Sequence, residues 1–394
     1  CIYKLKPNCD NMDNLSSNHL KKIELSLPSE YYFDENFYIK ELKKIWSKNW
    51  IYVCHVSRLK KKLSFLTLSI GKQNIIIVQN SEGKLKAYFN TCRHRGSILC
   101  EKETGVLKSK VFVCPYHQWS YSVDTGQLLK VASFSELPDD FKKDEFSLFP
   151  IKLKVWRGCV FINLKSDASF DENSLFQRNP EPFKNFPIEE MIVSNVWEKT
   201  INCNWKSFWE NFNECLHCPN VHPELTDLVP MFTRRIINPL DLPGWVPKTD
   251  ISDPKFSGGL KKGAQTWSED GSAQDCQIQS LTKEEILKGH VYASSWPSMF
   301  IGGYSDHIRI VRVIPSGSEK VTILAEWLFE KKTLENKKYN KDNVIKFAKR
   351  VMEQDAHACE LNQKGIHSHP YKNGFLMPEE YVIKNFHDWL RKQL

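Results

Sequence analysis

The spacing of apolar residues predicts a β-rich first half and a mixed second half. Between Asp34 and Trp50 apolar positions recur at helical spacing, and Asp34 is placed to cap the first turn, which predicts an amphipathic helix. Short alternating or continuous apolar runs then predict an antiparallel β domain that ends at Leu164. These runs cover residues 50–53, 65–70, 74–79, 85–90, 110–113, 120–123 and 155–164.

The second half carries longer elements. Residues 165–187 form a polar, proline-containing connector, and a strand is expected over Met191–Ile201. Helices are expected from Asn204 to about His217 and from Asn343 to Gly365. Because 394 residues exceed what one hydrophobic core usually organises, two domains, or one domain with another inserted, are expected. A polar arm is expected over residues 1–30.

Composition and charge narrow the class of protein. The net charge is +8, but the lysines are scattered among acids, which indicates a solvated surface; the alternative is a docking face for an acidic electron-transfer partner. A nucleic-acid partner is not expected, because the basic residues are not gathered in one arginine-rich stripe. A membrane anchor is not expected either, since no apolar run is long enough to span a bilayer. We therefore predict a cytoplasmic protein, or one of an organelle stroma or matrix if a transit segment has been removed.

Twelve cysteines are about 3 % of the chain, too few for a disulfide scaffold. We expect those outside the candidate metal motifs to be reduced and buried as small hydrophobic residues. Outside the first 30 residues these are Cys54, Cys100, Cys159, Cys203, Cys215, Cys218, Cys276 and Cys359.

Two short motifs each combine a cysteine with a histidine. They are Cys92-Arg-His94 and Cys114-Pro-Tyr-His117. Thiolates hold iron and sulfide, and imidazoles raise the reduction potential, so the set suits a Rieske [2Fe–2S] cluster with Cys92 and Cys114 on one iron and both histidines on the other. Zinc is the alternative, although zinc fingers usually group cysteine with cysteine and histidine with histidine.

A second candidate metal site lies in the second half. Glu214 and His217 are three residues apart and share a helix face, and Pro219 is expected to end the helix so that His222 folds back beside them. Asp355 lies among apolar neighbours in the later helix. It is either a surface acid paired to Lys349 or His357, or the carboxylate of a 2-His-1-carboxylate triad for non-haem Fe(II). The candidate Rieske cluster in the same chain favours the triad, because a one-electron carrier needs a second site that uses the electrons.

From about residue 31 onward the sequence resembles the catalytic α subunits of Rieske non-haem iron oxygenases, the ring-hydroxylating oxygenase family. The resemblance rests on both cluster motifs, on Asn204-Trp-Lys with Glu214, His217 and His222, on Gln354-Asp355, and on Phe386-His-Asp-Trp-Leu. It implies an α+β fold with a helix over residues 31–49, an antiparallel Rieske domain over 50–165, and a helix-grip catalytic domain over 166–394. Residues 291–304, 307–314 and 320–329 suit the curved antiparallel sheet of that domain.

The resemblance also implies the cofactors and partners. A separate flavin and iron–sulfur reductase would draw on NAD(P)H and deliver electrons to the cluster, and the mononuclear Fe(II) would use them with O₂ to hydroxylate a C–H bond. In the family electrons cross between subunits of a ring, commonly a homotrimer, through a carboxylate that matches Glu214 here. The alternative for Glu214 is a surface acid without this role.

Residues 210–225 and His117-Gln-Trp are most similar to the branch that acts on quaternary ammonium compounds, by N-demethylation of a betaine or oxidation of choline or carnitine. Leu216 departs from that branch, which commonly has tyrosine there. Aromatic rings can hold such a cation, although aromatic residues in strands are more often core. The candidates are Trp245, Tyr292, Trp296, Phe300 and Tyr304. An aromatic ring-hydroxylating dioxygenase and a Rieske electron-transfer protein without oxygenase activity remain the alternatives.

Overall fold

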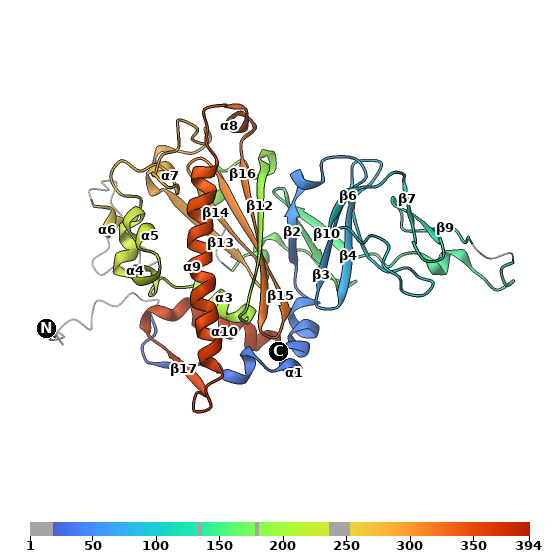
Figure 1. Cartoon of the computed structure of the whole chain (residues 1–394), viewed down its shortest axis with the longest axis horizontal. Coiled ribbons are helices and arrows are strands. Elements are labelled where there is room, and N and C mark those ends of the chain that lie inside the picture. The colour runs from blue at the N-terminus through green and yellow to red at the C-terminus, as the bar shows by residue number, and fades with distance from the viewer. Residues whose placement is uncertain (1–18, 133–135, 178–180, 236–252) are drawn as a thin grey trace.

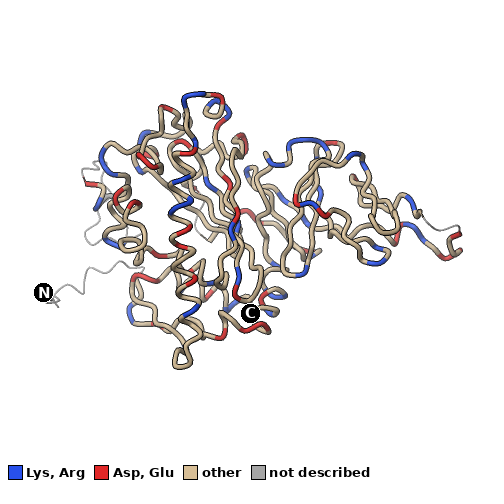
Figure 2. Tube along the Cα trace, in the orientation of Figure 1, with Lys and Arg blue, Asp and Glu red and all other residues tan. Residues whose placement is uncertain are grey.

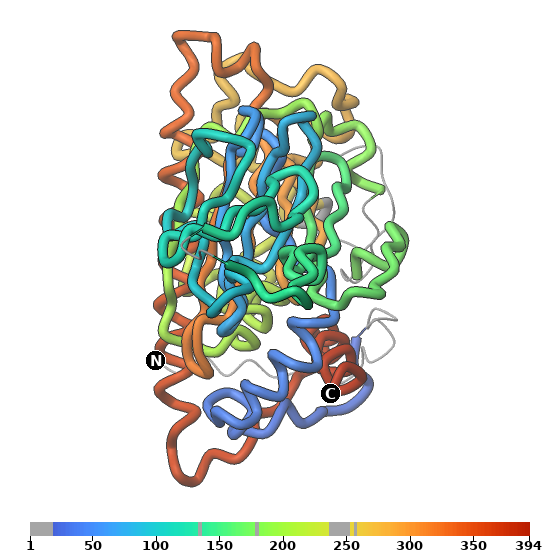
Figure 3. Tube along the Cα trace, turned by 90° about the vertical axis from the view of Figure 1, so that its right-hand side faces the viewer, coloured from blue at the N-terminus to red at the C-terminus, as the bar shows by residue number. Residues whose placement is uncertain are grey.

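The computed structural model describes residues 19–132, 136–177, 181–235 and 253–394, which form two β-rich units side by side (Figure 1). Viewed from the side of the first unit, its strands lie in front of the second unit (Figure 3). Basic and acidic residues are interspersed over both units (Figure 2), in agreement with the predicted solvated surface. Among the described residues, no helix combines the length and apolar character needed to cross a bilayer.

Three small antiparallel sheets build the first unit. Their strand orders are β10-β11-β2, β5-β4-β3-β6 and β7-β8-β9. The antiparallel β domain expected from the apolar runs is thus confirmed. The strands are β2 Ile51–His55, β3 Ser64–Ile70, β4 Gln73–Gln79, β5 Leu85–Phe89, β6 Thr104–Val106, β7 Val111–Val113, β8 Ser120–Ser122, β9 Leu128–Lys130, β10 Lys152–Trp156 and β11 Cys159–Asn163.

The single strand expected over residues 155–164 is wrong, because the chain reverses within it. Arg157 and Gly158 both have positive φ, 43° and 82°, and join β10 to β11 as a tight hairpin. Two successive left-handed residues match the right-handed twist of the flanking strands. The apolar run looked continuous because both strands of the hairpin are rich in apolar residues.

A five-stranded antiparallel sheet in the order β12-β16-β15-β14-β13 forms the centre of the second unit. The strands are β12 Ile192–Ile201, β13 His290–Ser295, β14 Met299–Tyr304, β15 Ile308–Gly317 and β16 Lys320–Phe329. On β15, Val311 and Val313 share a core with residues of α9 (Asp342–Ile366) and α3 (Trp205–Phe212), whereas Ile308 and Ile310 share one with residues of β2 and β11. The helices therefore cover one face of the sheet and the first unit covers the other (Figure 1).

Residues 291–304 were expected as one strand but form the two antiparallel strands β13 and β14. Pro297 lacks the N–H that a strand interior needs, and the Ser298 N–H bonds to the Ser295 carbonyl at 3.1 Å, which closes a turn between the two strands. The strands predicted near 191–201, 307–314 and 320–329 are confirmed as β12, β15 and β16.

The remaining elements are short, except for the last helix. They are β1 Glu24–Pro28, α1 Glu35–Glu41, α2 Glu172–Leu175, α4 Cys218–Val221, α5 Pro223–Leu228, α6 Pro254–Ser257, α7 Lys283–Lys288, α8 Lys331–Glu335, β17 Asn373–Leu376 and α10 Tyr381–Gln393. The elements near the two ends of the chain, α1 and α10, lie together below the main sheet (Figures 1 and 3).

Two predictions for the first 50 residues need correction. Glu24–Pro28 is not a loose arm, because it pairs as β1 with β17 from the far end of the chain. The helix expected over 34–50 begins as predicted, since the Asp34 carboxylate accepts the Phe37 N–H at 2.7 Å, but the α-helix ends at Glu41 and a π-helical turn continues to Trp46. Residues 1–18 of the predicted arm lie outside the described residues.

Candidate active site and cluster loops

The two cluster motifs lie on adjacent loops at the end of the first unit. The first loop follows β5, and the second joins β7 to β8. Each loop is closed by its own backbone: the Cys92 N–H bonds to the Ser97 carbonyl and the Cys114 N–H to the Trp119 carbonyl, both at 2.8 Å. The motif cysteines Cys92 and Cys114 are each only 2 % exposed. Both thiols are thus fixed inside the end of the domain.

Hydrogen-bond donors surround the two sulfurs. The Tyr121 hydroxyl on β8 lies 3.2 Å from the Cys92 sulfur. Burial raises the pKa of the Cys114 thiol, but the backbone N–H groups of Tyr116 and His117 outweigh burial and hold this pKa below its usual value. Such donors stabilise a thiolate, which is the form that binds a metal. Sequence reasoning did not single out Tyr121, since alternation along a three-residue strand carries too little signal.

The motif histidines complete the set at the tip of the loops. The ring centroids of His94 and His117 are 4.7 Å apart, and Trp119 stacks on His94 at 4.9 Å. Both imidazoles are partly exposed, in contrast to the buried sulfurs. Sulfur donors inside and nitrogen donors at the surface fit a cluster whose two irons have different ligands. The residues present therefore fit a Rieske cluster.

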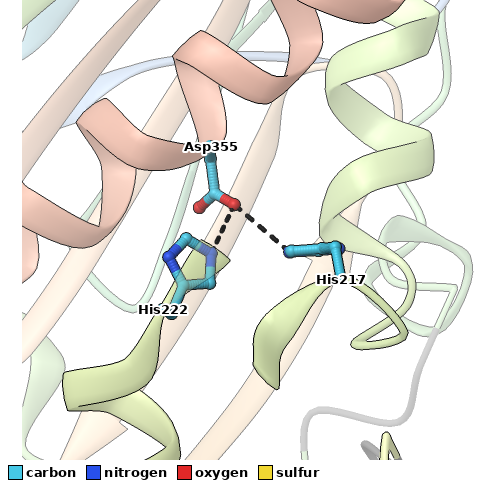
Figure 4. Close-up of side chains that lie close together, drawn as sticks. All are labelled: His217, His222 and Asp355. Carbon is cyan, nitrogen blue, oxygen red and sulfur yellow. Dashed lines mark hydrogen bonds and ion pairs between the residues drawn. The ribbon is translucent and has the colours of Figure 1, made fainter. Parts of the chain in front are cut away.

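The second candidate site lies between α9 and the chain that follows α3. Asp355, on α9, points at the imidazoles of His217 and His222 (Figure 4). Its Oδ1 lies 3.3 Å from His217 Nε2 and 2.8 Å from His222 Nε2, and all three candidate ligand atoms lie within 4.8 Å of one another. Neighbouring ligands on a metal with bonds of about 2.1 Å are about 3 Å apart. The three donors thus fit one ion and leave other coordination positions open.

Partners on the far side of each imidazole set its orientation. His217 Nδ1 lies 2.5 Å from Glu214 Oε1, and His222 Nδ1 lies 2.8 Å from Gln354 Oε1. Gln354 in turn donates to Glu224 at 2.8 Å. When Nδ1 of each ring is the donor, Nε2 presents its lone pair toward Asp355, which is the tautomer that a metal needs. The structure thus brings Glu214 to the position expected of a carboxylate that orients His217.

Electrostatics couple the three candidate ligands. Burial lowers the pKa of His217, but hydrogen bonds to Asp355 and Glu214 outweigh it and raise the pKa to about 10. Burial raises the pKa of Asp355, but the two histidines outweigh it and lower the pKa to about 2. A divalent cation bound to the three donors would take the place of protons on Nε2 of the imidazoles and would attract the same carboxylate.

The local structure of this segment differs from the predicted helix. The helix expected to reach His217 ends at Phe212, because the Glu214 side chain accepts the backbone N–H of Leu216 and so competes with helical bonding. Glu214 and His217 therefore meet across a turn and not along a helix face. Pro219 does not end a helix either; it lies in the first turn of α4, where a missing N–H costs nothing.

Cys215 and Cys218 were expected as free thiols, but they form a disulfide across this turn. Their Cα atoms are 5.0 Å apart because the turn brings residues three apart close together. The other six cysteines of that group are free and buried, as expected.

Only some of the candidate substrate residues lie near the triad. Tyr292 and Tyr304 do, with their hydroxyls 3.2 Å apart. Phe300 stacks on Phe212 with ring centroids 3.9 Å apart, and the Phe212 ring in turn lies 6.1 Å from that of Tyr292. Trp296 lies elsewhere, packed against Phe386 and Trp389. Trp245 lies outside the described residues.

Sequence reasoning missed the ring at the centre of this region, Trp267. Its ring centroid lies 5.2 Å from that of Tyr304 and 6.1 Å from that of Tyr292, and Phe232 and His290 complete the group. We call these five residues the ring cluster. The core around it includes Cys215 and Cys218 beside His217, and Phe347 and Val351 on α9 before Asp355. Trp267 lies in a segment without periodicity, so only the folded chain reveals its position.

Comparisons with known proteins cover nearly the whole chain. The model of the ring hydroxylating alpha subunit (catalytic domain) matches residues 182–394, and that of the Rieske [2Fe-2S] domain matches residues 49–142. The glycine betaine monooxygenase oxygenase subunit of Pseudomonas aeruginosa is 27 % identical over 94 % of this chain and 89 % of its own. The chloroplastic choline monooxygenase of Beta vulgaris is 27 % identical over 94 % of this chain and 77 % of its own.

Solved structures share the fold. The quaternary ammonium Rieske monooxygenase CntA in complex with L-carnitine superposes with a TM-score of 0.71 at 21 % identity, covering 94 % of this chain and 96 % of CntA. Naphthalene 1,2-dioxygenase from Rhodococcus sp. gives 0.69 at 19 % identity, covering 94 % of both chains. With the Rieske domain matched ahead of the catalytic domain, this chain belongs to the ring-hydroxylating alpha subunit family of Rieske non-haem iron oxygenases.

Proposed function

We propose that this oxygenase hydroxylates an N-methyl group or a neighbouring carbon of a quaternary ammonium compound. The observation that carries the proposal is the ring cluster beside the triad, which offers several aromatic faces and no carboxylate of its own. Ring faces attract a desolvated cation by about 0.5 to 2 kcal/mol per contact. The names of the relatives, glycine betaine, choline and carnitine monooxygenases, support the same substrate class.

In this proposal His217, His222 and Asp355 hold the mononuclear iron, and Cys92, Cys114, His94 and His117 hold the cluster. When bound, the cluster supplies single electrons and the iron activates O₂. Glu214 holds the His217 ring through its Nδ1 proton, and Gln354 does the same for His222. The ring cluster keeps water away and presents the substrate's methyl group to the open side of the triad.

For a betaine, one O₂, two electrons and two protons give water and a hydroxymethyl ammonium product. That product loses a proton and releases formaldehyde, so the C–N bond breaks with its electron pair on nitrogen and leaves a demethylated amine. Oxidation at the alcohol carbon of choline would give an aldehyde and no formaldehyde.

The electrons are proposed to come from a separate reductase and to cross between neighbouring copies of the chain. The cluster loops near β7 and the triad near α4 lie on opposite sides of the five-stranded sheet (Figure 1), so we expect the electrons to cross between copies and not within one. Inter-subunit electron transfer is described for a quaternary ammonium Rieske monooxygenase whose structure shares this fold. A ring, as in a homotrimer, would bring the cluster loops of one copy to Glu214 of the next.

A substrate screen tests the proposal. Glycine betaine, choline, carnitine and proline betaine are compared with naphthalene, benzoate and a neutral tert-butyl analogue, using a surrogate reductase. Substrate-dependent O₂ uptake with stoichiometric formaldehyde or aldehyde is expected only for the quaternary compounds. If only naphthalene or benzoate gives O₂ uptake coupled to a hydroxylated product, the quaternary ammonium assignment is wrong.

A further inference from the structure

One arginine on the helix-covered face of the main sheet is buried without an acidic partner. Arg309 on β15 is 4 % exposed, and its Nε is buried without a hydrogen-bond partner. Throughout the described ranges, no carboxylate lies within ion-pair distance of its guanidinium. Burial of a charge without a counter-charge destabilises the fold, so the burial of the Arg309 guanidinium calls for an explanation.

The same strand shows how this protein satisfies a buried arginine elsewhere. Arg312, three residues further along β15, is 7 % exposed and faces the first unit. Its Nη1 donates to the Val53 carbonyl at 2.7 Å, and its Nη2 lies 3.7 Å from Glu198. Among the described residues, the contact found for the Arg309 guanidinium is the face of the Tyr304 ring, whose centroid lies 5.7 Å from the guanidinium carbon. The two arginines are similarly buried and differ in their partners: Arg312 has a carbonyl and a carboxylate, and Arg309 has a ring face.

The position of Arg309 places it beside the ring cluster. In the sheet, Gly302 on β14 pairs with Tyr292 on one side and with Arg309 on the other, so the three residues form one row. A Cβ at Gly302 would collide with the Tyr292 ring and the Tyr304 hydroxyl, each 2.9 Å away. Glycine thus lets both rings approach the sheet next to Arg309.

Arg309 and Asp355 of the triad both affect the pKa of Tyr292. Burial raises the pKa of Tyr292 well above its usual value; the charge of Arg309 opposes that increase and the charge of Asp355 adds to it. The charges of Arg309 and Asp355 thus both act on Tyr292, which shares a row of the sheet with Arg309. We infer that a substrate in contact with the ring cluster would come close to both Arg309 and the triad.

We propose that Arg309 binds the carboxylate of a zwitterionic substrate, so that the preferred substrates are betaines and not choline. The proposal rests on the function proposed above and specifies its substrate class. A guanidinium can hold a carboxylate through two parallel hydrogen bonds, and the bound carboxylate would supply the missing counter-charge. A betaine brings both charges, with its ammonium on the ring faces. Choline brings only a second positive charge into a region that already holds Arg309.

The test compares Arg309→Met and Arg309→Lys with the wild type, each as the full oxygenase with both iron centres and a surrogate reductase. We measure kcat and KM for glycine betaine, carnitine and choline from formaldehyde or aldehyde release. The wild type should favour glycine betaine and carnitine over choline, and R309M should raise the KM of both carboxylate substrates about 100-fold. The KM for choline should fall in R309M, because the like charge of Arg309 is gone. R309K should fall between the wild type and R309M, since it keeps the charge and loses the paired hydrogen bonds.

Two controls separate recognition from stability. Iron content and the visible cluster spectrum should be unchanged in R309M, and Arg312→Met, which disrupts a satisfied arginine, should affect all substrates alike. The inference is overturned if the wild type uses choline as well as betaines, or if R309M weakens choline and betaines equally. If no quaternary compound is oxidised while naphthalene or benzoate is, the proposed function falls and this inference falls with it.

Discussion

At the scale of single residues, the candidate iron site depends on a second layer of polar side chains. Glu214 and Gln354 each hold one imidazole by Nδ1, and Glu224 holds Gln354. Such partners fix the tautomer and direction of a ligand and typically change metal affinity or activity about 10- to 100-fold when removed. Two predictions separate the roles of the ligands from the role of Glu214.

Asp355→Ala should remove the mononuclear iron and abolish turnover, because two neutral imidazoles alone hold Fe(II) weakly. The visible spectrum of the cluster should persist, since its ligands lie in the other unit. Cys114→Ser provides the converse: cluster lost, mononuclear iron kept. Metal analysis with visible spectra checks both variants, and loss of the cluster in D355A would show that the two sites are not independent.

Glu214→Gln keeps the size of the side chain and removes its charge. Both centres should stay bound and the cluster should still accept electrons from the donor, but product formation should fall about 10- to 100-fold because His217 is held less firmly and the link between the centres is weakened. Single-turnover kinetics of cluster reoxidation measure the step directly. Glu284→Gln, an exposed carboxylate on α7, controls for net charge; unchanged turnover in E214Q would make Glu214 an ordinary surface acid.

At the scale of elements, the long segments were predictable and the turns that shape the site were not. The periodicity of apolar residues predicts helix α9 and strands β12, β15 and β16. The candidate metal ligands could be predicted from the chemistry of their side chains and from their spacing. The end of α3 depends on a side chain, Glu214, that bonds its own backbone, and the split of residues 291–304 depends on a single proline. Trp267 and Arg309 lie near the candidate site because of contacts between segments far apart in the chain. A local sequence pattern does not predict such contacts.

The attachment of α1 to α3 is a second feature that local patterns miss. Glu41 and Lys206 form a fully buried ion pair at 2.6 Å, and the Trp205 indole also donates to Glu41 at 2.8 Å. Burial raises the pKa of Glu41, although Lys206 opposes that shift. The pair holds the start of the chain against the helix that leads to the candidate iron ligands.

Glu41→Gln should lower the free energy of unfolding by about 3 to 5 kcal/mol, because Lys206 is left as an uncompensated buried charge. The double change Glu41→Leu with Lys206→Met should recover much of that loss, since it replaces the pair by apolar groups of similar size. Calorimetric unfolding of the holoenzyme checks both. A double variant less stable than E41Q would show that the pair itself contributes net stability.

At the scale of the whole molecule, the two candidate centres lie on opposite sides of the main sheet (Figure 1), which supports the proposed electron transfer between copies. Cys114→Ser and Asp355→Ala subunits should each be inactive alone. Co-expressed in one ring, a D355A subunit can supply electrons to the iron of a C114S neighbour, and random mixing makes about a quarter of the junctions competent. Activity of about a quarter of wild type is therefore expected, and its absence in verified mixed oligomers would argue for transfer within one copy.

A single chain should hold both a Rieske cluster and a separate mononuclear iron. Anaerobic metal and sulfide analysis, with visible and EPR spectra before and after reduction, can detect both centres in one sample. We expect about three irons and two sulfides per chain, and a Rieske-type EPR signal that appears on reduction. Zinc at the two cysteine–histidine loops, without sulfide and without visible absorption, would contradict it.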